Sequence, residues 1–182
     1  MNITPAKDKY IKTVAAEMKK KFGYKNVMAV PRIKRVIVNV GIGRILKEND
    51  KIEEVVNSIT AITGQKPVKT KARKAISGFK IREGMEIGVK ATLRGKRMWQ
   101  FIDRLVSATL PRTRDFQGIN RKAVDNGGNL NIGIKEHMIF PEISPERVKY
   151  TFGLQVTIST DAKTQEEGLE LFKLLGFPIK SE

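Results

Sequence analysis

The chain has 182 residues, of which 40% are hydrophobic and 30% charged, so it can bury a core and is not disordered by composition. It has no cysteine, which excludes disulfides, thiol catalysis and thiolate metal sites, and no apolar run near the ~20 residues that a membrane span needs. Its 35 basic and 19 acidic residues give a net charge of +16, which favours a polyanionic partner: nucleic acid first, an anionic membrane surface second.

Four helices are predicted from apolar residues at helical spacing and from their end signals. In chain order, the first runs from Thr4 and Pro5 to Gly23, the second from Asp50 to Gly64, the third from Gly95 to before Pro111, and the last from Thr164 to Gly176. Their expected inward residues include Ile11, Val14, Met18 and Phe22; Ile52, Val55, Val56, Ile59 and Ile62; Met98, Phe101, Ile102 and Leu105; and Leu171, Leu174 and Leu175. We expect capping boxes at Asp50 to Glu53 and at Thr164 to Glu167. Gly168 should weaken the last helix by about 1 kcal/mol relative to alanine.

Five segments between these helices alternate apolar and polar residues, which predicts strands. They are "PVKTKA" at 67–72, "RVIVNVG" at 35–41, "IGVKATLR" at 87–94, "NLNIGIK" at 129–135 and "FGLQVTIS" at 152–159. Alternation of this kind is typical of a largely antiparallel sheet with one face covered by helices and the other open. No repeat or linker divides the chain, so we expect one α+β domain over residues 1–182.

The polar faces of these strands carry lysine, arginine, asparagine, glutamine, threonine, serine and glycine, with a single isoleucine and no acid. Charge is also concentrated along the chain, because residues 66–97 hold 11 basic and two acidic residues, or +9 of the +16. A solvated face normally mixes both signs of charge. The open face is therefore predicted to bind a phosphate-rich ligand. Since it lacks aromatic side chains, a structured RNA read by its shape suits it better than stacked single strands.

The sequence gives little support for a catalytic site or a metal site. The only histidine, His137, is expected at a surface or strand edge, and the carboxylates are not clustered as a magnesium site requires. The "GIG" at 41–43 lacks the third glycine of a dinucleotide fingerprint. The first ten residues lack the apolar segment of a secretory signal. We therefore expect a cytosolic protein that is no enzyme and needs no cofactor, metal or small-molecule substrate.

Several blocks together resemble the bacterial form of the large-subunit ribosomal protein five family, which carries 5S rRNA in the central protuberance. They are "RVIVNVGIG", "TGQKPV", "KAISGFKIREGMEIGVKATLRG", "LPRTRDFQG", "GNLNIGIKEHMIFPEI" and "KLLGFP". The blocks span nearly the whole chain in the family's order. The resemblance implies a structural role in the cytoplasmic ribosome, with 5S rRNA, 23S rRNA, P-site tRNA and small-subunit ribosomal protein thirteen as partners.

The resemblance also implies site residues. For 5S rRNA they are Asn39, Gln65 and Thr92, with Lys69, Lys71, Lys90 and Arg94 as neighbouring cations. For tRNA they lie in the long basic loop at about 72–86: Arg73, Lys74, Ser77, Gly78, Phe79, Lys80 and Arg82. For the inter-subunit bridge they are Arg112 and Arg114 in "PRTRDFQG", with "EHMIFPEI" as the other possible location.

Two rival functions stay open at this point. One is a free architectural protein that coats nucleic acid, including duplex DNA. The other is an RNA-processing enzyme. For the loop "SGFKIREG" at 77–84, a solvated mobile hairpin is the alternative to an RNA contact.

Overall fold

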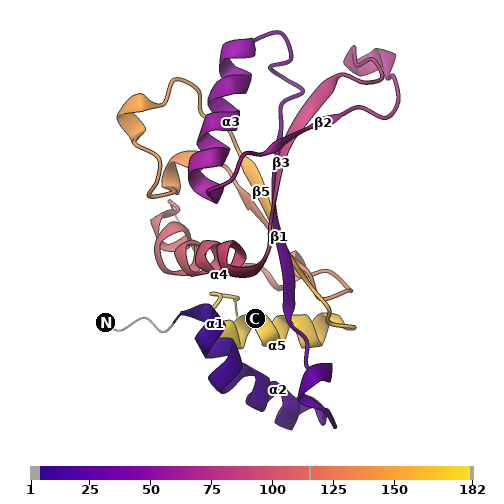
Figure 1. The fold of residues 1–182 in the computed structure, drawn as a ribbon, viewed down its shortest axis with the longest axis vertical. Coiled ribbons are helices and arrows are strands. Elements are labelled where there is room, and N and C mark those ends of the chain that lie inside the picture. Colours follow the sequence, from indigo (N-terminus) through magenta and orange to yellow (C-terminus); the bar gives the residue numbers. More distant parts are fainter. Residues whose placement is uncertain (1–4, 115, 181–182) are drawn as a thin grey trace. The chain divides into compact units, whose positions relative to one another are not determined.

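The computed structural model describes residues 5–114 and 116–180 of the chain. In chain order its helices are α1 (Ala6–Lys9), α2 (Ala15–Phe22), α3 (Asn49–Thr63), α4 (Gly95–Arg104) and α5 (Gln165–Leu175). Its strands are β1 (Ile33–Gly41), β2 (Val68–Lys71), β3 (Glu86–Leu93), β4 (Leu130–Ile134) and β5 (Leu154–Thr160). A π-helical turn over Tyr10–Val14 joins α1 to α2, and a second one over Leu105–Thr109 follows α4. Figure 1 shows these elements along the chain.

The strands form one sheet in the order β2-β3-β1-β5-β4. β2 pairs antiparallel with β3. The N–H of Ile42, just after β1, donates to the carbonyl of Ile87 at the start of β3, and the Thr157 side chain of β5 bonds Asn131 of β4. The predicted α+β class with a largely antiparallel sheet is confirmed. The alternation is confirmed as well, because the apolar residues of β1, β4 and β5 on one parity are buried while their polar neighbours are exposed or half-buried.

The chain forms two compact units, and four of the five strands pass from one unit into the other. Among the described residues, unit 1 consists of 5–36, 93–114, 116–132 and 157–180, and unit 2 of 37–92 and 133–156. The prediction of a single domain stays a prediction.

The core of unit 2 lies between α3 and one face of its strand segments. Ile52, Val55, Ile59 and Ile62 of α3 are buried, as are Val38 and Val40 of β1 and Val89 and Ala91 of β3. The helix ends at Gly64, which adopts a left-handed conformation with φ of 69°. The connection between β2 and β3 extends beyond the ends of both strands (Figure 1).

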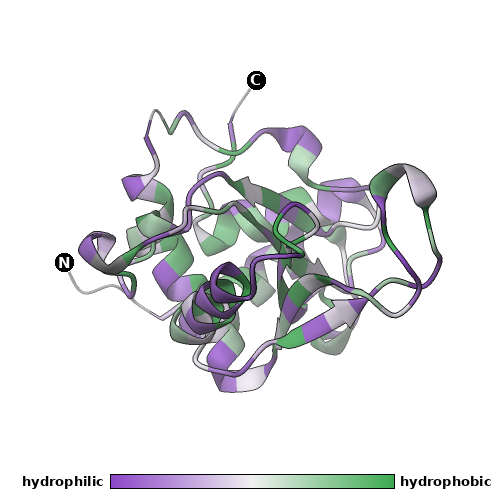
Figure 2. Ribbon diagram, turned by 90° about the horizontal axis from the view of Figure 1, so that it is seen from above, coloured by the Kyte–Doolittle hydropathy of each residue, from purple (hydrophilic) through white to green (hydrophobic). Residues whose placement is uncertain are grey.

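The core of unit 1 is built mainly from helices. Met18 of α2, Phe101 and Ile102 of α4, and Leu171 and Phe172 of α5 are almost fully buried. Two polar contacts join the first and last helical regions: the Tyr24 hydroxyl donates to Glu167 at 2.5 Å, and Lys21 pairs with Glu170 at 2.7 Å. In Figure 2, hydrophilic and hydrophobic residues alternate along the helices and strands, as expected for elements with one buried side.

Two details of the predicted helices are wrong. Ile11 is 60% exposed, because a π-helical turn changes which side chains face inward over Tyr10–Val14. The capping box at Asp50 is absent, since α3 begins at Asn49 and its N-cap, Glu48, makes no side-chain capping bond. The expected N-cap of the first helix, Thr4, lies outside the described residues. At α5 the expected N-cap is confirmed, because Thr164 Oγ1 accepts from the Glu167 N–H at 3.3 Å.

Gly168 has a packing reason that sequence propensity does not include. A β-carbon built on Gly168 would lie 2.5 Å from the Cα of Gly128, within the same unit. Such a distance requires a backbone to move, so alanine would not fit here. The glycine in the middle of α5 allows the close approach of the loop before β4.

Candidate nucleic-acid interface

Gln65 and Thr92 are brought together at the point where α3 ends. The left-handed Gly64 turns the chain so that Gln65 follows directly, and Thr63 Oγ1 donates to the Gln65 carbonyl at 3.1 Å. The Gln65 side-chain Nε2 donates to the Thr92 carbonyl at 3.1 Å. Both residues are half-buried. The Gln65 amide is thus fixed in place beside β3, with its Oε1 left as an acceptor.

Asn39 lies on the neighbouring strand. The antiparallel register set by the Ile42–Ile87 hydrogen bond, continued along β1 and β3, places Asn39 opposite Lys90. Burial agrees with this register, because Asn39 and Lys90 are both exposed while Val40 and Val89 are both buried. The open face of unit 2 therefore presents a neutral amide next to a cation.

Lys69 does not belong to that face, which corrects the grouping of Lys69 with Lys90. In the β2–β3 ladder Lys69 is paired with Val89, whereas Val68 is paired with Lys90. Directly paired residues of an antiparallel ladder share a face. The Lys69 ammonium instead forms an ion pair with Glu86 at 2.8 Å. The alternation of β2 misleads because this edge strand is exposed on both sides, with Val68 68% exposed.

The other two basic residues predicted for the 5S rRNA site are Lys71 and Arg94. Lys71 is exposed at the end of β2, where the ladder register shifts. Arg94 is exposed in unit 1, where it is the N-cap residue of α4. The RNA-contacting role of every residue in this set stays a prediction.

A shallow hollow of about 500 Å³ lies on unit 2 among β1, the end of β4 and the start of β5. Its lining contains Gly41, Gly133 and Gly153 together with Asn39, Gln155 and Lys135, and no acid. Gly41 and Gly133 have ordinary backbone conformations and no atom within 4 Å of an added β-carbon. Nothing in the described chain requires glycine at these two positions, and a glycine within a strand often marks a bulge, a tight bend, or close approach of a ligand or another backbone.

Gln155 and Lys135 are exposed residues that the set of predicted site residues did not contain. The alternation of both strands places them on the polar face, and the glycines at 133 and 153 are the signal that could have singled them out.

In unit 1, some polar side chains of the sheet's polar face have their hydrogen-bond partners within the protein. Thr157 Oγ1 donates to Asn131 Oδ1 at 2.7 Å, and Ser159 Oγ donates to Asn129 Oδ1 at 3.2 Å. Asn129 also donates through Nδ2 to the Asp125 carboxylate at 3.0 Å. These cross-strand pairs stabilise the sheet. A polar residue on this face is therefore not by itself a ligand contact.

The loop between β2 and β3 forms a small hairpin of its own. Ile76 and Ile81 exchange both backbone hydrogen bonds, at 2.9 and 3.2 Å, and close a tip made of Ser77, Gly78, Phe79 and Lys80. A 3₁₀ turn covers Ser77–Phe79, and Lys80 follows in a left-handed conformation with φ of 54°. At the base, the Ala72 N–H donates to the Met85 carbonyl at 2.8 Å.

The predicted tRNA-contacting side chains are all exposed on this hairpin: Arg73, Lys74, Ser77, Phe79, Lys80 and Arg82. Gly84 has φ of 81°, so the turn that re-enters β3 needs a glycine, whereas Gly78 has no such constraint.

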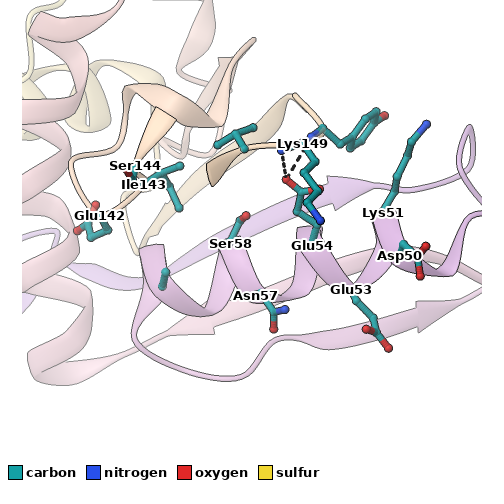
Figure 3. A pocket seen from close by; sticks show the side chains of 13 residues that line it. Asp50, Lys51, Glu53, Glu54, Asn57, Ser58, Glu142, Ile143, Ser144 and Lys149 are labelled. Carbon is teal, nitrogen blue, oxygen red and sulfur yellow. Dashed lines mark hydrogen bonds between the residues drawn. The ribbon is translucent and has the colours of Figure 1, made fainter. Parts of the chain in front are cut away.

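The two candidate bridge regions differ in character. Arg112 and Arg114 are both exposed, after α4, with Arg112 ending a 3₁₀ turn. The segment after "EHMIFPEI" instead packs along α3 and forms one side of a pocket of about 840 Å³ in unit 2 (Figure 3). Glu54 accepts from the backbone N–H groups of Lys149 and Tyr150 at 2.7 and 3.1 Å, which ties this segment to the helix.

The pocket beside α3 is rich in carboxylates although the protein is strongly basic. Its acidic lining residues are Asp50, Glu53, Glu54 and Glu142, and its basic ones are Lys51 and Lys149. In Figure 3, Asp50 and Glu53 point away from the backbone of the helix, while Glu54 points toward the opposite segment. This surface suits a cationic partner better than RNA.

His137 is not at a surface, which corrects the expectation. Its side chain has 0% exposure and stacks on Phe152 with ring centroids 4.0 Å apart. Its Nδ1 accepts from the Phe152 N–H at 3.5 Å, and its Nε2 is buried with no hydrogen-bond partner among the described residues. Burial lowers the pKa of His137 below its ordinary value, opposed by the hydrogen bond to Phe152 and by the Glu54 carboxylate.

Within residues 5–114 and 116–180, no group of three or more metal-ligating side chains is arranged to hold an ion. Over the same part of the chain, no helix is long and apolar enough to span a bilayer.

Comparison with known proteins gives a consistent result. Residues 26–82 match the family model "Ribosomal protein L5", and residues 86–179 match the model "ribosomal L5P family C-terminus". The "Large ribosomal subunit protein uL5" of Colwellia psychrerythraea is 50% identical over 96% of this chain and 97% of its own length. The protein of the same name from Halothermothrix orenii is 51% identical over 94% and 96%, and that from Heliobacterium modesticaldum is 48% identical over 97% and 98%.

Proposed function

The chain belongs to the ribosomal protein L5 family, and we propose that the open sheet face of unit 2 binds 5S rRNA and attaches it to 23S rRNA in the central protuberance. As a member of this family the chain is a structural constituent of the large ribosomal subunit, with ribosomal RNA as a partner, in the cytoplasmic ribosome. The family is not enzymatic, which confirms the expectation that the chain is no enzyme.

The observation that carries the 5S proposal is the fixed amide of Gln65 beside Thr92, together with the exposed Asn39 and Lys90 on adjacent strands. Neutral amides and a hydroxyl can bond ribose 2′-hydroxyls and base edges, while the ammonium neutralises a phosphate. A shallow polar face without aromatic side chains matches a folded RNA recognised by its shape. The glycine-lined hollow beside Asn39 allows a ribose–phosphate chain to approach the strands closely.

The basic loop is proposed to contact P-site tRNA. Its hairpin lies beyond the strand ends, and its exposed cations Arg73, Lys74, Lys80 and Arg82 outnumber the single acid Glu83. The loop adds little to the core, because Ala72 is its only buried residue between 72 and 85. It can therefore serve a second RNA without disturbing the sheet.

For the bridge to small-subunit ribosomal protein thirteen, the carboxylate-rich pocket beside α3 favours the region of "EHMIFPEI" over Arg112 and Arg114. Acidic side chains on a protein of net charge +16 are well suited to a cationic protein partner and repel RNA. Charge reversal at Glu53 and Asp50, both exposed, should weaken association of the subunits while leaving 5S binding intact.

The proposed function is tested by competition between 5S rRNA and duplex DNA of equal length for the full chain at moderate salt. A ribosomal role requires a clear preference for 5S rRNA and co-sedimentation with large subunits. Equal affinity for both nucleic acids, without co-sedimentation, would favour the free architectural protein instead.

A further inference from the structure

Phe79 is a large aromatic side chain that the structure holds in solvent. It is 74% exposed, and the neighbouring Ile76 is 49% exposed. The described part of the chain has only six large hydrophobic side chains that are so exposed, and two of them are on this one hairpin. Two exposed apolar side chains on one turn form a candidate interaction site.

The ring is placed by an ordered backbone. The Phe79 N–H donates to the Ile76 carbonyl at 3.3 Å, and the Lys80 N–H donates to the Ser77 carbonyl at 2.9 Å. With the two Ile76–Ile81 bonds, these hold the backbone of the tip in one turn. The left-handed Lys80, the one described residue other than glycine with positive φ, then closes the turn. The side chain of Phe79 is thus presented without being used for packing.

The charges around the ring identify the class of partner. Arg73, Lys74, Lys80 and Arg82 are exposed on the same hairpin against the single acid Glu83, for a local net charge of 4 − 1 = +3. A polyanion is therefore attracted to the tip. Among polyanions, RNA also offers the flat π surface of a base, on which an aromatic ring stacks.

We propose that Phe79 is a stacking platform for an accessible nucleobase of the RNA that the loop contacts, with the flanking cations holding the adjoining phosphates. The inference rests on the proposed function, because it names the chemistry by which the loop would recognise RNA. The sheet face, which lacks exposed aromatic side chains, would recognise RNA shape, and the hairpin would recognise an exposed base.

The experiment uses the full chain saturated with unlabelled 5S rRNA, so that the sheet face is occupied. The probe is an RNA stem–loop with a single unpaired 2-aminopurine in its loop, whose fluorescence is quenched by stacking. We expect quenching by wild type and by Phe79→Tyr. Phe79→Leu keeps apolar volume but lacks the ring, so it should bind at least about five- to tenfold more weakly and leave the probe bright at saturation.

Lys80→Gln is the matched control for charge. It should weaken binding and reduce its salt dependence, yet quench normally once saturated, because the ring is unchanged. Met28→Leu, at an exposed apolar side chain outside the hairpin, controls for apolar contact and should behave as wild type.

The possible outcomes distinguish the proposed function from the stacking inference. Failure of the wild-type chain to bind 5S rRNA contradicts the proposed function itself. Normal 5S binding with equal quenching by wild type and Phe79→Leu overturns the stacking inference alone. The stacking inference is also overturned if wild type binds vesicles of phosphatidylglycerol and phosphatidylcholine, Phe79→Leu does not, and the RNA probe is not quenched. The ring would then belong to a membrane contact.

Discussion

The Gln65 side chain donates a 3.1 Å hydrogen bond to the backbone carbonyl of Thr92, so Gln65, which follows Gly64 at the end of α3, is tied to the strand that carries the proposed RNA-binding hydroxyl. Gln65→Ala should therefore have two effects. Loss of one half-buried hydrogen bond should lower the free energy of unfolding by about 0.5–1.5 kcal/mol. The 5S affinity should fall as well, because the substitution removes the amide that is proposed to bind RNA.

Asn39→Ala is the comparison that separates these effects. Asn39 is exposed, and its removal should leave the unfolding free energy nearly unchanged while 5S affinity falls. Urea denaturation and filter binding measure the two quantities. Unchanged 5S affinity in both variants would exclude these amides from the interface.

The glycines of the hollow give an independent test. Gly41→Val and Gly133→Val introduce side chains that strands favour, at positions with no atom within 4 Å of an added β-carbon. The melting temperature should stay the same or rise, while 5S affinity falls because the branched side chains occupy the space for RNA. The matched control compares two alanine variants: Gly41→Ala, inside the hollow, and Gly43→Ala, just outside it. Full 5S affinity in the two valine variants would show that RNA does not enter the hollow.

Shortening residues 73–85 to a tight turn should spare 5S binding and the fold. Little core is lost, because between Arg73 and Met85 every residue is exposed or half-buried. The defect should appear as faster loss of tRNA from the P site of reconstituted ribosomes, and Lys80→Glu with Arg82→Glu should reproduce it by repulsion of phosphate. A folded, shortened protein that no longer binds 5S rRNA would place the loop in the 5S site.

His137 predicts how stability depends on pH. Burial lowers its pKa in the folded protein, whereas the unfolded chain takes up a proton near the ordinary value of about 6.5. Below that pH the unfolded state binds more protons than the folded state, so the stabilising contribution is complete above pH ~6.5 and is lost as pH falls toward the lowered pKa. His137 is the only histidine, so His137→Phe should flatten the unfolding free energy between pH 5.5 and 7.5. An identical slope in both proteins would contradict this assignment.

The sequence predicts most of the fold because its elements have strong local signals. The buried valines of β1 alternate with residues that are exposed or half-buried, and Gly23, Gly64 and Gly176 end helices in left-handed conformations. The alternation of apolar and polar residues predicts which face a side chain lies on where one face of the strand is buried. The alternation is weak in β2, which is exposed on both faces, and for this reason it predicts Lys69 on the face of Lys90 although the ladder pairs Lys69 with Val89.

Features that depend on contacts far apart in the chain could not be predicted locally. The Gln65–Thr92 bond joins residues 27 positions apart, and Gly168 is explained by its packing on Gly128. His137 is buried by stacking on Phe152, which its polar neighbourhood in the sequence conceals. The site residues carried by the family resemblance remain predictions that depend on the RNA itself.

The RNA-binding role of the open face of unit 2 is tested by the salt dependence of 5S binding for wild type, Lys90→Ala and Lys69→Ala. The two variants lose the same charge from one β2–β3 ladder, but from opposite faces. If the open face of unit 2 binds RNA, Lys90→Ala should lower affinity and reduce the slope of log K against log salt by about 0.7–0.9, while Lys69→Ala keeps the wild-type slope. Equal slopes for Lys90→Ala and wild type, or a loss confined to Lys69→Ala, would show that the open face of unit 2 does not bind 5S rRNA.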